Sequence, residues 1–485
     1  RRVSRPCELG ALKARELIAT KALSPVELLD DCIQRIEAVN PAVNAVVADC
    51  FERARAEARS AEAAVVNGAE LGPLHGLPLG IKDLNVTEGI RTTFGSLIYK
   101  DHVPDKDERI VAALRGAGAI ALGKTNTPEF GAGANTVNKV YGATRNPFDT
   151  ARTCGGSSGG SAVALACDMM PICTGSDTGG SLRIPAAFCG VVAIRGTPGL
   201  VPSDRRTMGL TTYSVQGPMA RNVADAALML SAMAGSDPCD PLARPLDAES
   251  YARIEETELS SLRVAFSEDL GFAHVDNGIR ETFKKCMARL APLFAGCEAR
   301  DPEMKGSTRV FWLIRGLHFL AKDLDHYRSH KALLGPNVVN NVEAGLAMKP
   351  EDIGWAYAES TRIYRKLQEF FRHFDLLICP TVAVPPFPVE QLYCTHINGV
   401  ELENYIQWAD LTAGLTLTGH PIVSIPCGLD PTGAPFGIQI VGPRWHSDRF
   451  LIAAAAAIEG ALSGDPEFSR PIPDIEALQA AKATA

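Results

Sequence analysis

The segments CGGSSGGSA (154–162) and GSDTGGSLRIPAAFCG (175–190) are the most informative part of this sequence, and they decide which fold we expect. They lie in a region, 145–215, that is dense in Gly, Ser and Thr. Short apolar runs such as MMPICTGSD (169–177) and CGVVAIRG (189–196) interrupt it throughout, so it is not a linker. Runs that are apolar on both faces suit the central strands of a sheet covered by helices. We therefore expect buried strands joined by Gly-rich turns here.

Similar apolar runs lie on both sides of this region. They are LPLGIKDL (77–84), GAIALGKT (118–125) and FDLLICPT (374–381). Residues 419–442, GHPIVSIPCGLDPTGAPFGIQIVG, read as two strands joined by a turn at Asp430 to Gly433. Since strands lie toward both ends of the chain, we expect one α/β domain. Its mixed central β-sheet would be covered by helices on both faces and would carry a helical insertion.

Helical patterns occupy the start and a long later part of the chain. Ser24 precedes Pro25, and Glu27 lies three residues after Ser24, a pattern typical of a capped helix start. An Ala/Arg/Glu-rich stretch predicts a second helix from about 48 to 66. We divide the single domain, 1–485, into N-terminal helices (about 1–70), a core (about 75–235), a helical, substrate-side region (about 240–375) and a return to the sheet (about 376–465).

Composition narrows the class of protein and its partners. The net charge of −8 gives no electrostatic footprint for nucleic acid, and no apolar run reaches the ~18 residues of a membrane span. The thirteen cysteines show no CxxC pair and predict reduced thiols in the cytoplasm. The histidines show no HExxH spacing, so we expect no metal and no cofactor. The sequence shows no signal peptide, and whether a leader was removed is an open question. A homodimer is also compatible with the sequence.

A phosphate-binding loop is one interpretation of GAIALGKT, which satisfies G-x4-G-K-[ST] with Lys124 as its lysine. That loop requires a strand, a flexible turn and then a helix whose N-terminus faces the phosphate. Here Ala119 to Leu122 are themselves strand-like, and Asn126 to Pro128 form a turn rather than a helix. We favour a core strand that ends in a turn.

A Ser-His-Asp hydrolase is a second interpretation, because Gly155 to Gly159 (GGSSG) satisfies the G-x-S-x-G elbow. The elbow follows a strand, and the preceding residues NPFDTARTC are a poor apolar strand. His420 or His446 would have to supply the base. This interpretation stays the runner-up.

The interpretation we favour combines Lys82, Ser157 and Ser181. A serine at its ordinary pKa is a poor nucleophile and needs a base within hydrogen-bond reach. A lysine can be that base when desolvation lowers its pKa, and the apolar neighbours of Lys82 favour this. Gly179 and Gly180 before Ser181 allow successive N–H groups to point one way, as in an oxyanion hole.

Together these segments resemble the amidase signature family. GGSSGGS (155–161) and GSDTGGSLRIPAAFCG (175–190) are similar to its hallmark almost letter for letter, and Ser181 follows Ser157 by twenty-four positions, as in the family. GIKD (80–83), GKTNTPEF (123–130) and TGHPIVSIP (418–426) follow the family's order. The resemblance covers nearly the whole chain and is weakest from about 240 to 375.

The resemblance implies a role for each residue. Ser181 would be the acylated nucleophile, Ser157 a bridging serine after a cis peptide bond, and Lys82 the general base. The backbone of Thr178, Gly179, Gly180 and Ser181 would form the oxyanion hole. Ser158 and Ser176 would support the network with their hydroxyls, and we expect Asp177 and Arg183 to pair and fix the loop.

The expected substrate is a small-molecule amide, cleaved to a carboxylic acid and ammonia or an amine. Residues 309–320, RVFWLIRGLHFL, could line an apolar acyl or aryl pocket or be an amphipathic core helix. We expect small aryl or alkyl amides. The alternative within the family is the glutaminase subunit of a tRNA-dependent amidotransferase, which would need a charged pair to bind an amino acid and a second subunit.

Overall fold

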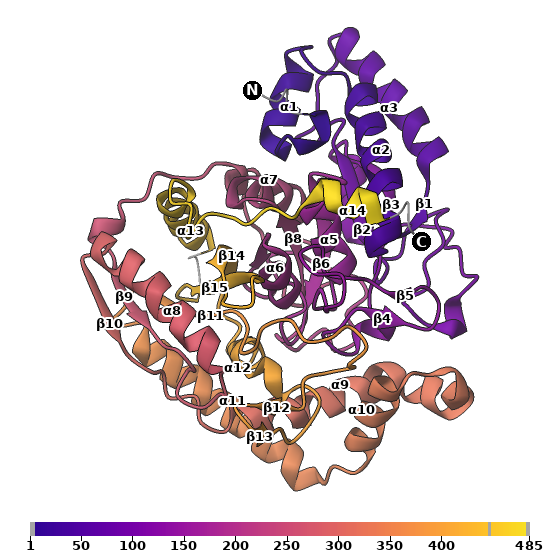
Figure 1. The fold of residues 1–485 in the computed structure, drawn as a ribbon. Coiled ribbons are helices and arrows are strands. Elements are labelled where there is room, and N and C mark those ends of the chain that lie inside the picture. The colour runs from indigo at the N-terminus through magenta and orange to yellow at the C-terminus, as the bar shows by residue number, and fades with distance from the viewer. Residues whose placement is uncertain (1–4, 445–447, 482–485) are drawn as a thin grey trace.

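A mixed sheet runs through the centre of the molecule (Figure 1). The computed structural model describes residues 5–444 and 448–481, and within these residues eleven strands form this sheet. In sheet order they are β1 (Val46–Asp49), β3 (Ile120–Thr125), β2 (Pro78–Lys82), β6 (Ile172–Asp177), β8 (Val215–Ala220), β7 (Val192–Arg195), β14 (Ile422–Leu429), β15 (Pro435–Val441), β11 (Leu376–Pro380), β9 (Arg263–Phe266) and β10 (Gly296–Ala299). The strand β2 is parallel to β3 and to β6, whereas β7, β8, β14 and β15 pair antiparallel. Strands from both ends of the chain thus share one sheet, which confirms the predicted fold class.

Helices pack on the sheet in several groups. The longer ones are α1 (Ala11–Ala19), α2 (Pro25–Val43), α3 (Phe51–Val66), α4 (Arg109–Gly116), α5 (Gly159–Ala166), α6 (Arg183–Cys189), α7 (Val223–Met233), α8 (Asn277–Leu290), α9 (Ser307–His330), α10 (Pro336–Leu346), α11 (Pro350–Phe370), α12 (Asp410–Thr416), α13 (Asp448–Ser463) and α14 (Ile475–Ala481). The helices α5 and α6 contact each other and the sheet, and every residue of both is buried. The helices α7 and α13 form a second contacting pair over the sheet. These buried layers explain why the central strands carry apolar side chains on both faces.

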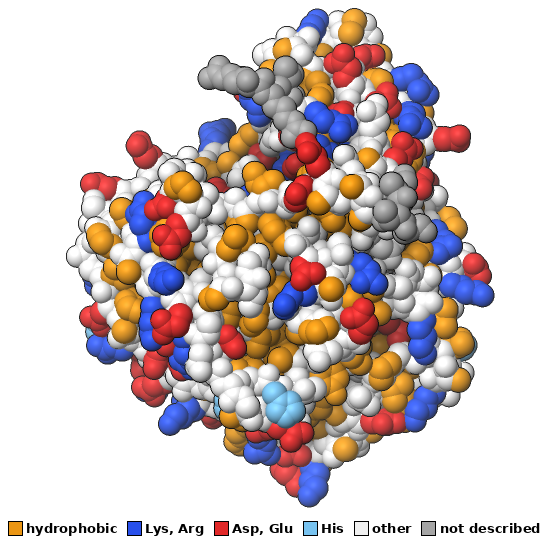
Figure 2. Space-filling model, viewed as in Figure 1, with side chains coloured by type: hydrophobic (Ala, Val, Ile, Leu, Met, Phe, Trp, Pro, Cys, Tyr) orange, Lys and Arg blue, Asp and Glu red, His pale blue; other side chains and the backbone are white. Residues whose placement is uncertain are grey.

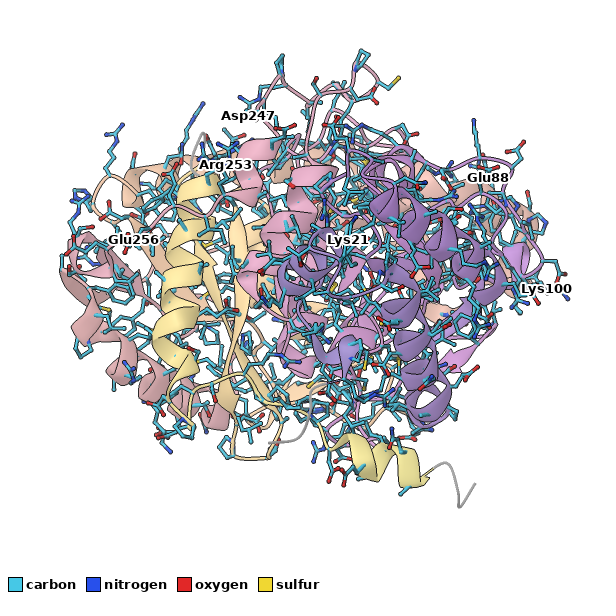
Figure 3. All side chains as sticks on the ribbon, turned by 90° about the horizontal axis from the view of Figure 1, so that it is seen from above. Lys21, Glu88, Lys100, Asp247, Arg253 and Glu256 are labelled. Carbon is cyan, nitrogen blue, oxygen red and sulfur yellow. The ribbon has the colours of Figure 1, made fainter. Side chains whose placement is uncertain are left out.

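The outer helices define two ends of the molecule. In Figure 1, α1 to α3 lie at the top of the view and α9 to α11 lie at the bottom, with the sheet between them. Figure 2 shows basic and acidic side chains interspersed over the same face, with no extended patch of one sign. In Figure 3, seen from above, the labelled Glu88 and Lys100 lie toward one side of the molecule and Glu256 toward the other.

The predicted helix start at Ser24 is confirmed in detail. The Ser24 hydroxyl accepts hydrogen bonds from the N–H groups of Val26 and Glu27, and the Glu27 carboxylate accepts one from the Ser24 N–H at 3.1 Å. Each cap satisfies an N–H group that the first helical turn leaves without a partner. The hairpin β14–β15 also turns where predicted, at Asp430 to Gly433.

Other predicted elements need correction. Residues 46–49 form the edge strand β1, so the helix predicted from about 48 begins only at Phe51. The region 240–375 is not a purely helical insertion, because β9 and β10 lie within it and extend the sheet. Each has only four residues, which is too short for an alternating pattern to stand out among helices.

The described part of the chain contains neither a metal-ligand cluster nor a membrane-spanning helix. No group of three or more His, Cys, Asp or Glu residues in 5–444 and 448–481 could hold a metal ion. Over the same residues, no helix combines the length and the apolar character needed to cross a membrane. All thirteen cysteines are free thiols.

Candidate active site

The candidate site lies where two parallel strands end. Lys82 is the last residue of β2, and Ser176 is the last residue but one of β6. Because β2 and β6 are parallel neighbours, their carboxyl ends meet at the same edge of the sheet. The Thr174 hydroxyl of β6 accepts a hydrogen bond from the Lys82 N–H at 2.8 Å and thereby fixes the end of β2.

The Lys82 amine is buried among hydroxyl groups. The side chain is 0% exposed, and Nζ lies 2.7 Å from Ser157 Oγ, 2.8 Å from Ser158 Oγ and 3.0 Å from Ser176 Oγ. No carboxylate of the described residues lies within 4.0 Å of this amine. The structure thus brings together Lys82 and three of the serines that the sequence singled out. The Gly156–Ser157 peptide bond is cis, as the family resemblance implied.

Burial strongly favours the uncharged form of this lysine. Removal from water lowers the pKa of Lys82 well below its usual range, and the nearby positive charge of Lys322 lowers the pKa further. The negative charge of Asp177 acts in the opposite direction but does not compensate. An uncharged amine has a lone pair and can accept a proton from a hydroxyl group.

Ser181 lines a cavity together with Ser157 and Ser176. Its backbone carbonyl accepts a hydrogen bond from the Ser158 N–H at 3.1 Å, and both Ser181 and Ser157 line the cavity. Among the described residues, however, no hydrogen bond links the hydroxyls of Ser157 and Ser181. Of the two hydrogen bonds expected between Lys82, the bridging Ser157 and Ser181, the one between Lys82 and Ser157 is therefore formed. The one between Ser157 and Ser181 is not.

The Gly-rich turn before Ser181 is held by one buried carboxylate. Asp177 accepts hydrogen bonds from the guanidinium groups of Arg183 (2.9 Å) and Arg195 (3.0 Å), and all three side chains are 0% exposed. Burial alone would raise the pKa of Asp177, but the two arginines hold it well below its usual range. The N–H groups of Gly180 and Leu182 also donate to this carboxylate. The predicted pair Asp177–Arg183 exists, and Arg195 is a third member that the sequence did not indicate.

The backbone donors of the turn do not all point into the cavity. The Gly180 N–H donates to Asp177 Oδ1 at 2.9 Å, so it is already used within the turn. Within the described chain, the N–H groups of Thr178, Gly179 and Ser181 have no acceptor. Gly180 has a φ of +129°, and an added Cβ would lie 2.3 Å from Thr412 Oγ1. This position therefore requires glycine for its conformation and for space.

The cavity beside these residues has a volume of about 360 Å³ and mixes aromatic with charged side chains. The rings of Phe130 and His326 stack at 5.0 Å, and Tyr99 packs edge-on against both. Charged lining groups come from α9, from residues 203–216 and from Glu108. This corrects the expectation of an apolar pocket lined by 309–320, because that segment contributes Arg315 and His318 as well as Phe319. No sequence pattern indicated Tyr99 or Phe94 as lining residues, since both lie beside an ordinary Gly-containing turn.

Neither competing motif forms a site. Lys124 is 0% exposed in β3 and donates to Thr87 Oγ1 at 2.9 Å and to Thr92 Oγ1 at 3.0 Å, so it is a buried structural lysine. His420 is also fully buried; its Nε2 lies 2.9 Å from Gln368 Oε1, and it does not line the cavity. The segment before Ser157 is not a strand. His446 lies outside the described residues.

The fold and this lysine–serine cluster define a class of enzyme, the amide hydrolases that act on C–N bonds other than peptide bonds. A family model described as Amidase matches residues 27–451. The chain belongs to this family, the amidase signature family.

Known proteins of the family cover nearly the whole chain. An acylamidase of Rhodococcus erythropolis is 33% identical over 454 residues, which cover 93% of this chain and 95% of that protein. A glutamyl-tRNA(Gln) amidotransferase subunit of Picosynechococcus sp. is 34% identical, covering 91% of this chain and 95% of that protein. Among solved structures, a bacterial aryl acylamidase superposes with a TM-score of 0.87 at 28% identity, covering 94% of this chain and 96% of that chain. A 6-aminohexanoate cyclic dimer hydrolase in complex with its substrate superposes with a TM-score of 0.81 at 29% identity, covering 97% and 98%.

Proposed function

We propose that this enzyme hydrolyses carboxylic amides through an acyl-enzyme on Ser181, with Lys82 as the base that acts through Ser157. The observation that carries the proposal is the buried Lys82 amine, which lies 2.7 Å from the Ser157 hydroxyl and has hydroxyl groups rather than a carboxylate around it. A structural buried lysine pairs with a carboxylate, as Lys124 does with Asp83 at 3.9 Å. A lysine beside three serine hydroxyls, without a carboxylate partner and with a pKa lowered by burial, is suited to proton transfer.

The proposed reaction begins with proton transfer along the hydroxyl groups. Ser157 gives its proton to the Lys82 amine and takes the proton of Ser181 as the Ser181 oxygen attacks the amide carbon. The N–H groups of Thr178, Gly179 and Ser181 are available to stabilise the oxyanion of the tetrahedral intermediate. We expect the Ser181 hydroxyl to turn toward Ser157 when substrate fills the cavity, since catalytic hydrogen bonds are often unformed without substrate.

The intermediate then collapses and the acyl group is released. The proton returns through Ser157 to the amide nitrogen, the C–N bond breaks, and ammonia or an amine leaves. Water next attacks the ester on Ser181 while the same groups accept its proton, and the carboxylic acid departs. In this scheme Asp177, Arg183 and Arg195 hold the turn and do not contact the reacting atoms.

Aryl amides are the substrates that the cavity favours. Phe94, Tyr99, Phe130 and Phe319 line it together with His326, and flat rings of this kind pack against an aryl group. The acylamidase and aryl acylamidase relatives support this choice. The relatives named as glutamyl-tRNA(Gln) amidotransferase subunits support a second candidate, a glutaminase that works with a partner protein.

The function is tested by labelling and by a panel of amides. A fluorophosphonate probe followed by peptide mapping is expected to mark Ser181. The panel contains an anilide, an alkyl amide, a peptide C-terminal amide and glutamine, each assayed with the purified chain alone. Cleavage of the anilide supports the first candidate. Glutaminase activity that appears only with an added partner protein would replace it with the second, and labelling of Ser157 or Ser158 instead would overturn the proposed nucleophile.

The pH dependence of the reaction tests the role of Lys82. Because burial lowers the pKa of Lys82, its amine is uncharged above that lowered pKa and becomes protonated as the pH falls through it. We expect kcat/KM to be constant at higher pH and to fall about tenfold per pH unit below the midpoint, since the protonated amine cannot accept a proton. The measurement is kcat/KM for one anilide from pH 5 to 9.

Two variants sharpen this test. Lys82→Arg is expected to be inactive at every pH, because a guanidinium stays charged. Lys322→Met is expected to move the acidic limb to higher pH, since the positive charge of Lys322 lowers the pKa of Lys82. A profile whose acidic limb is the same in the wild type and in Lys322→Met, together with an active Lys82→Arg, would remove Lys82 from the mechanism.

A further inference from the structure

Arg315 differs from every other buried arginine of the described chain. Five arginines are buried as whole residues, Arg35, Arg183, Arg195, Arg221 and Arg315, and a sixth, Arg206, has a buried side chain that pairs with Asp240. Arg35, Arg183, Arg195 and Arg221 also pair with carboxylates. The partners are Glu8 for Arg35, Asp177 for Arg183 and Arg195, and Asp168 for Arg221. Arg315 is 6% exposed and has no carboxylate within 4.0 Å among residues 5–444 and 448–481. Because a buried charge is normally paired, the missing partner of Arg315 requires an explanation.

The contacts of Arg315 hold its guanidinium in place but leave one edge unused. Its Nε donates a hydrogen bond to the Tyr405 hydroxyl at 2.7 Å. The guanidinium carbon lies over the ring of Phe319 at 5.1 Å and over the ring of Tyr405 at 5.4 Å. Such ring contacts use the faces of the guanidinium, and the in-plane N–H groups stay available to an acceptor.

The unused edge opens into the cavity of the candidate active site. Neither Nη1 nor Nη2 of Arg315 donates to a described residue, and neither is among the buried side-chain nitrogens that lack a partner. These groups therefore face open space, and Arg315 lines the cavity that also contains Ser157 and Ser181. Two turns further along α9, Lys322 lines the same cavity, and its Nζ donates to the Phe130 carbonyl at 2.7 Å.

The charges around the cavity also favour an anion. Its lining contains four cationic side chains, Arg205, Arg206, Arg315 and Lys322, and two carboxylates, Glu108 and Asp323. Three of these cations have a carboxylate within 4.0 Å, since Arg205 lies near Glu108, Arg206 near Asp240 and Lys322 near Asp323. Among the described residues, Arg315 is the cation of this lining that has none. With Asp240 counted as the partner of Arg206, the surplus positive charge of the lining is that of Arg315, in a chain whose net charge is −8. Such a difference draws anionic ligands toward the cavity.

We propose that Arg315 binds a carboxylate of the substrate, so that this enzyme acts on amides which carry a free carboxylate group. The two Nη groups form the fork that matches two carboxylate oxygens, and Lys322 adds a second positive charge on the same side of the cavity. This inference rests on the proposed function, because the same cavity must hold the amide beside Ser181. It narrows the substrate class from aryl or alkyl amides to amide acids.

Matched substrate pairs test the inference. On the acyl side, the 4-nitroanilides of the half-acids of succinate, glutarate and adipate are compared with those of butanoate, pentanoate and hexanoate. On the amine side, N-acetyl-4-aminobenzoate is compared with acetanilide. We expect kcat/KM to favour the carboxylate member by about 10- to 100-fold in one series, the range expected for a charged hydrogen-bonded contact. The series that shows the preference identifies the half of the substrate that Arg315 binds.

Variants connect the preference to the residue. Arg315→Gln is expected to reduce the carboxylate-to-neutral ratio of kcat/KM to near one, and Arg315→Lys to restore part of it. Arg309→Gln is the matched control on the same helix, because Arg309 is 60% exposed and pairs with Asp352 outside the cavity. Its ratio is expected to equal that of the wild type. Equal kcat/KM values within every pair, or a ratio unchanged in Arg315→Gln, would overturn the inference.

A binding experiment separates this inference from the proposed chemistry. Glutarate is titrated calorimetrically into Ser181→Ala and into the double variant Ser181→Ala/Arg315→Gln, with neutral glutaramide as the reference ligand. Glutarate is expected to bind Ser181→Ala at least tenfold more tightly than glutaramide does, and the double variant is expected to lose this difference. That result supports the anion site even if no anilide is cleaved. If anilides are cleaved but glutarate and glutaramide bind alike, the function stands and the inference fails. If Arg315→Gln does not fold, the wild-type ratios and the Ser181→Ala titration decide alone.

Discussion

Ser181→Ala is expected to lower kcat/KM for a cleaved amide by about 10³- to 10⁶-fold. The alanine has no oxygen that could form the acyl-enzyme, so only the oxyanion donors and substrate binding remain to assist attack by water. Because alanine is serine without its hydroxyl group, the substitution adds no atoms and the fold should be unchanged. The measurement is kcat/KM for an anilide together with mass spectrometry of the intact protein after brief exposure to substrate.

The mass measurement distinguishes a lost nucleophile from a damaged site. The wild type is expected to gain the mass of one acyl group, and Ser181→Ala is expected to gain none. Ser60→Ala is a suitable control, because Ser60 lies on the exposed part of α3 and its hydroxyl contacts only its own helix, at the Ala56 carbonyl. Acylation that persists in Ser181→Ala would show that another residue is the nucleophile.

Asp177→Ala is expected to destabilise the folded protein by about 3–5 kcal/mol or more, the range for breaking a buried ion pair. The loss is large because one carboxylate serves two buried guanidinium groups, and its removal leaves Arg183 and Arg195 charged without an anion. The Gly180 and Leu182 N–H groups lose their acceptor as well. The measurement is the free energy of unfolding from urea titration, followed by circular dichroism.

A surface pair provides the control for this prediction. Glu16 pairs with Lys13 at 2.9 Å, and both side chains are more than half exposed. Glu16→Ala is expected to change the free energy of unfolding by less than about 1 kcal/mol, since water screens such pairs. Equal effects of Asp177→Ala and Glu16→Ala would mean that the buried cluster does not stabilise the turn.

Most strands and the lysine–serine cluster could be predicted because their local patterns agree with the final packing. The runs that became β2, β3, β7 and β11 are mainly apolar without alternation, and they are buried on both faces. The Gly-rich segments around Ser157 and Ser181 are specific because few backbones need so many glycines at fixed spacing. At these places the local sequence pattern is sufficient to predict the local structure.

Other features depend on neighbours that are distant in the sequence. The strand β8 contains Gly217 and Pro218, which disfavour a strand, yet it pairs with β6 along its whole length. The pairing of β7 with β8 involves only Met219 and Ala220 of β8 and so does not reach Pro218. Proline removes one N–H donor, and the pairing with β6 tolerates it. No local pattern could reveal this compensation.

The charged residues of the cavity lining could not be predicted from the sequence either. RVFWLIRGLHFL has the composition of a buried helix, and much of it does face the core. The direction in which Arg315 points depends on Tyr405 and Asn341, which come from other parts of the chain; the Tyr405 hydroxyl accepts hydrogen bonds from both Arg315 and Asn341. The pairing of Arg195 with Asp177 likewise depends on distant contacts, because β8 lies between β6, which carries Asp177, and β7, which carries Arg195.

The turn that carries Ser181 is held by contacts with residues that are synthesised much later than Ser181. Arg183 donates to the Thr412 carbonyl, to Thr416 Oγ1 and to Gln439 Oε1, and the Thr412 hydroxyl donates to the Gly179 carbonyl. Gln439 follows Ser181 by roughly 260 residues, which corresponds to an interval on the order of 10 to 50 s at ordinary rates of synthesis. A nascent chain that has exposed Ser181 but not the hairpin β14–β15 therefore lacks the contacts that hold the turn around Ser181. The contacts that fix the turn around Ser181 can be complete only after Gln439 has been synthesised.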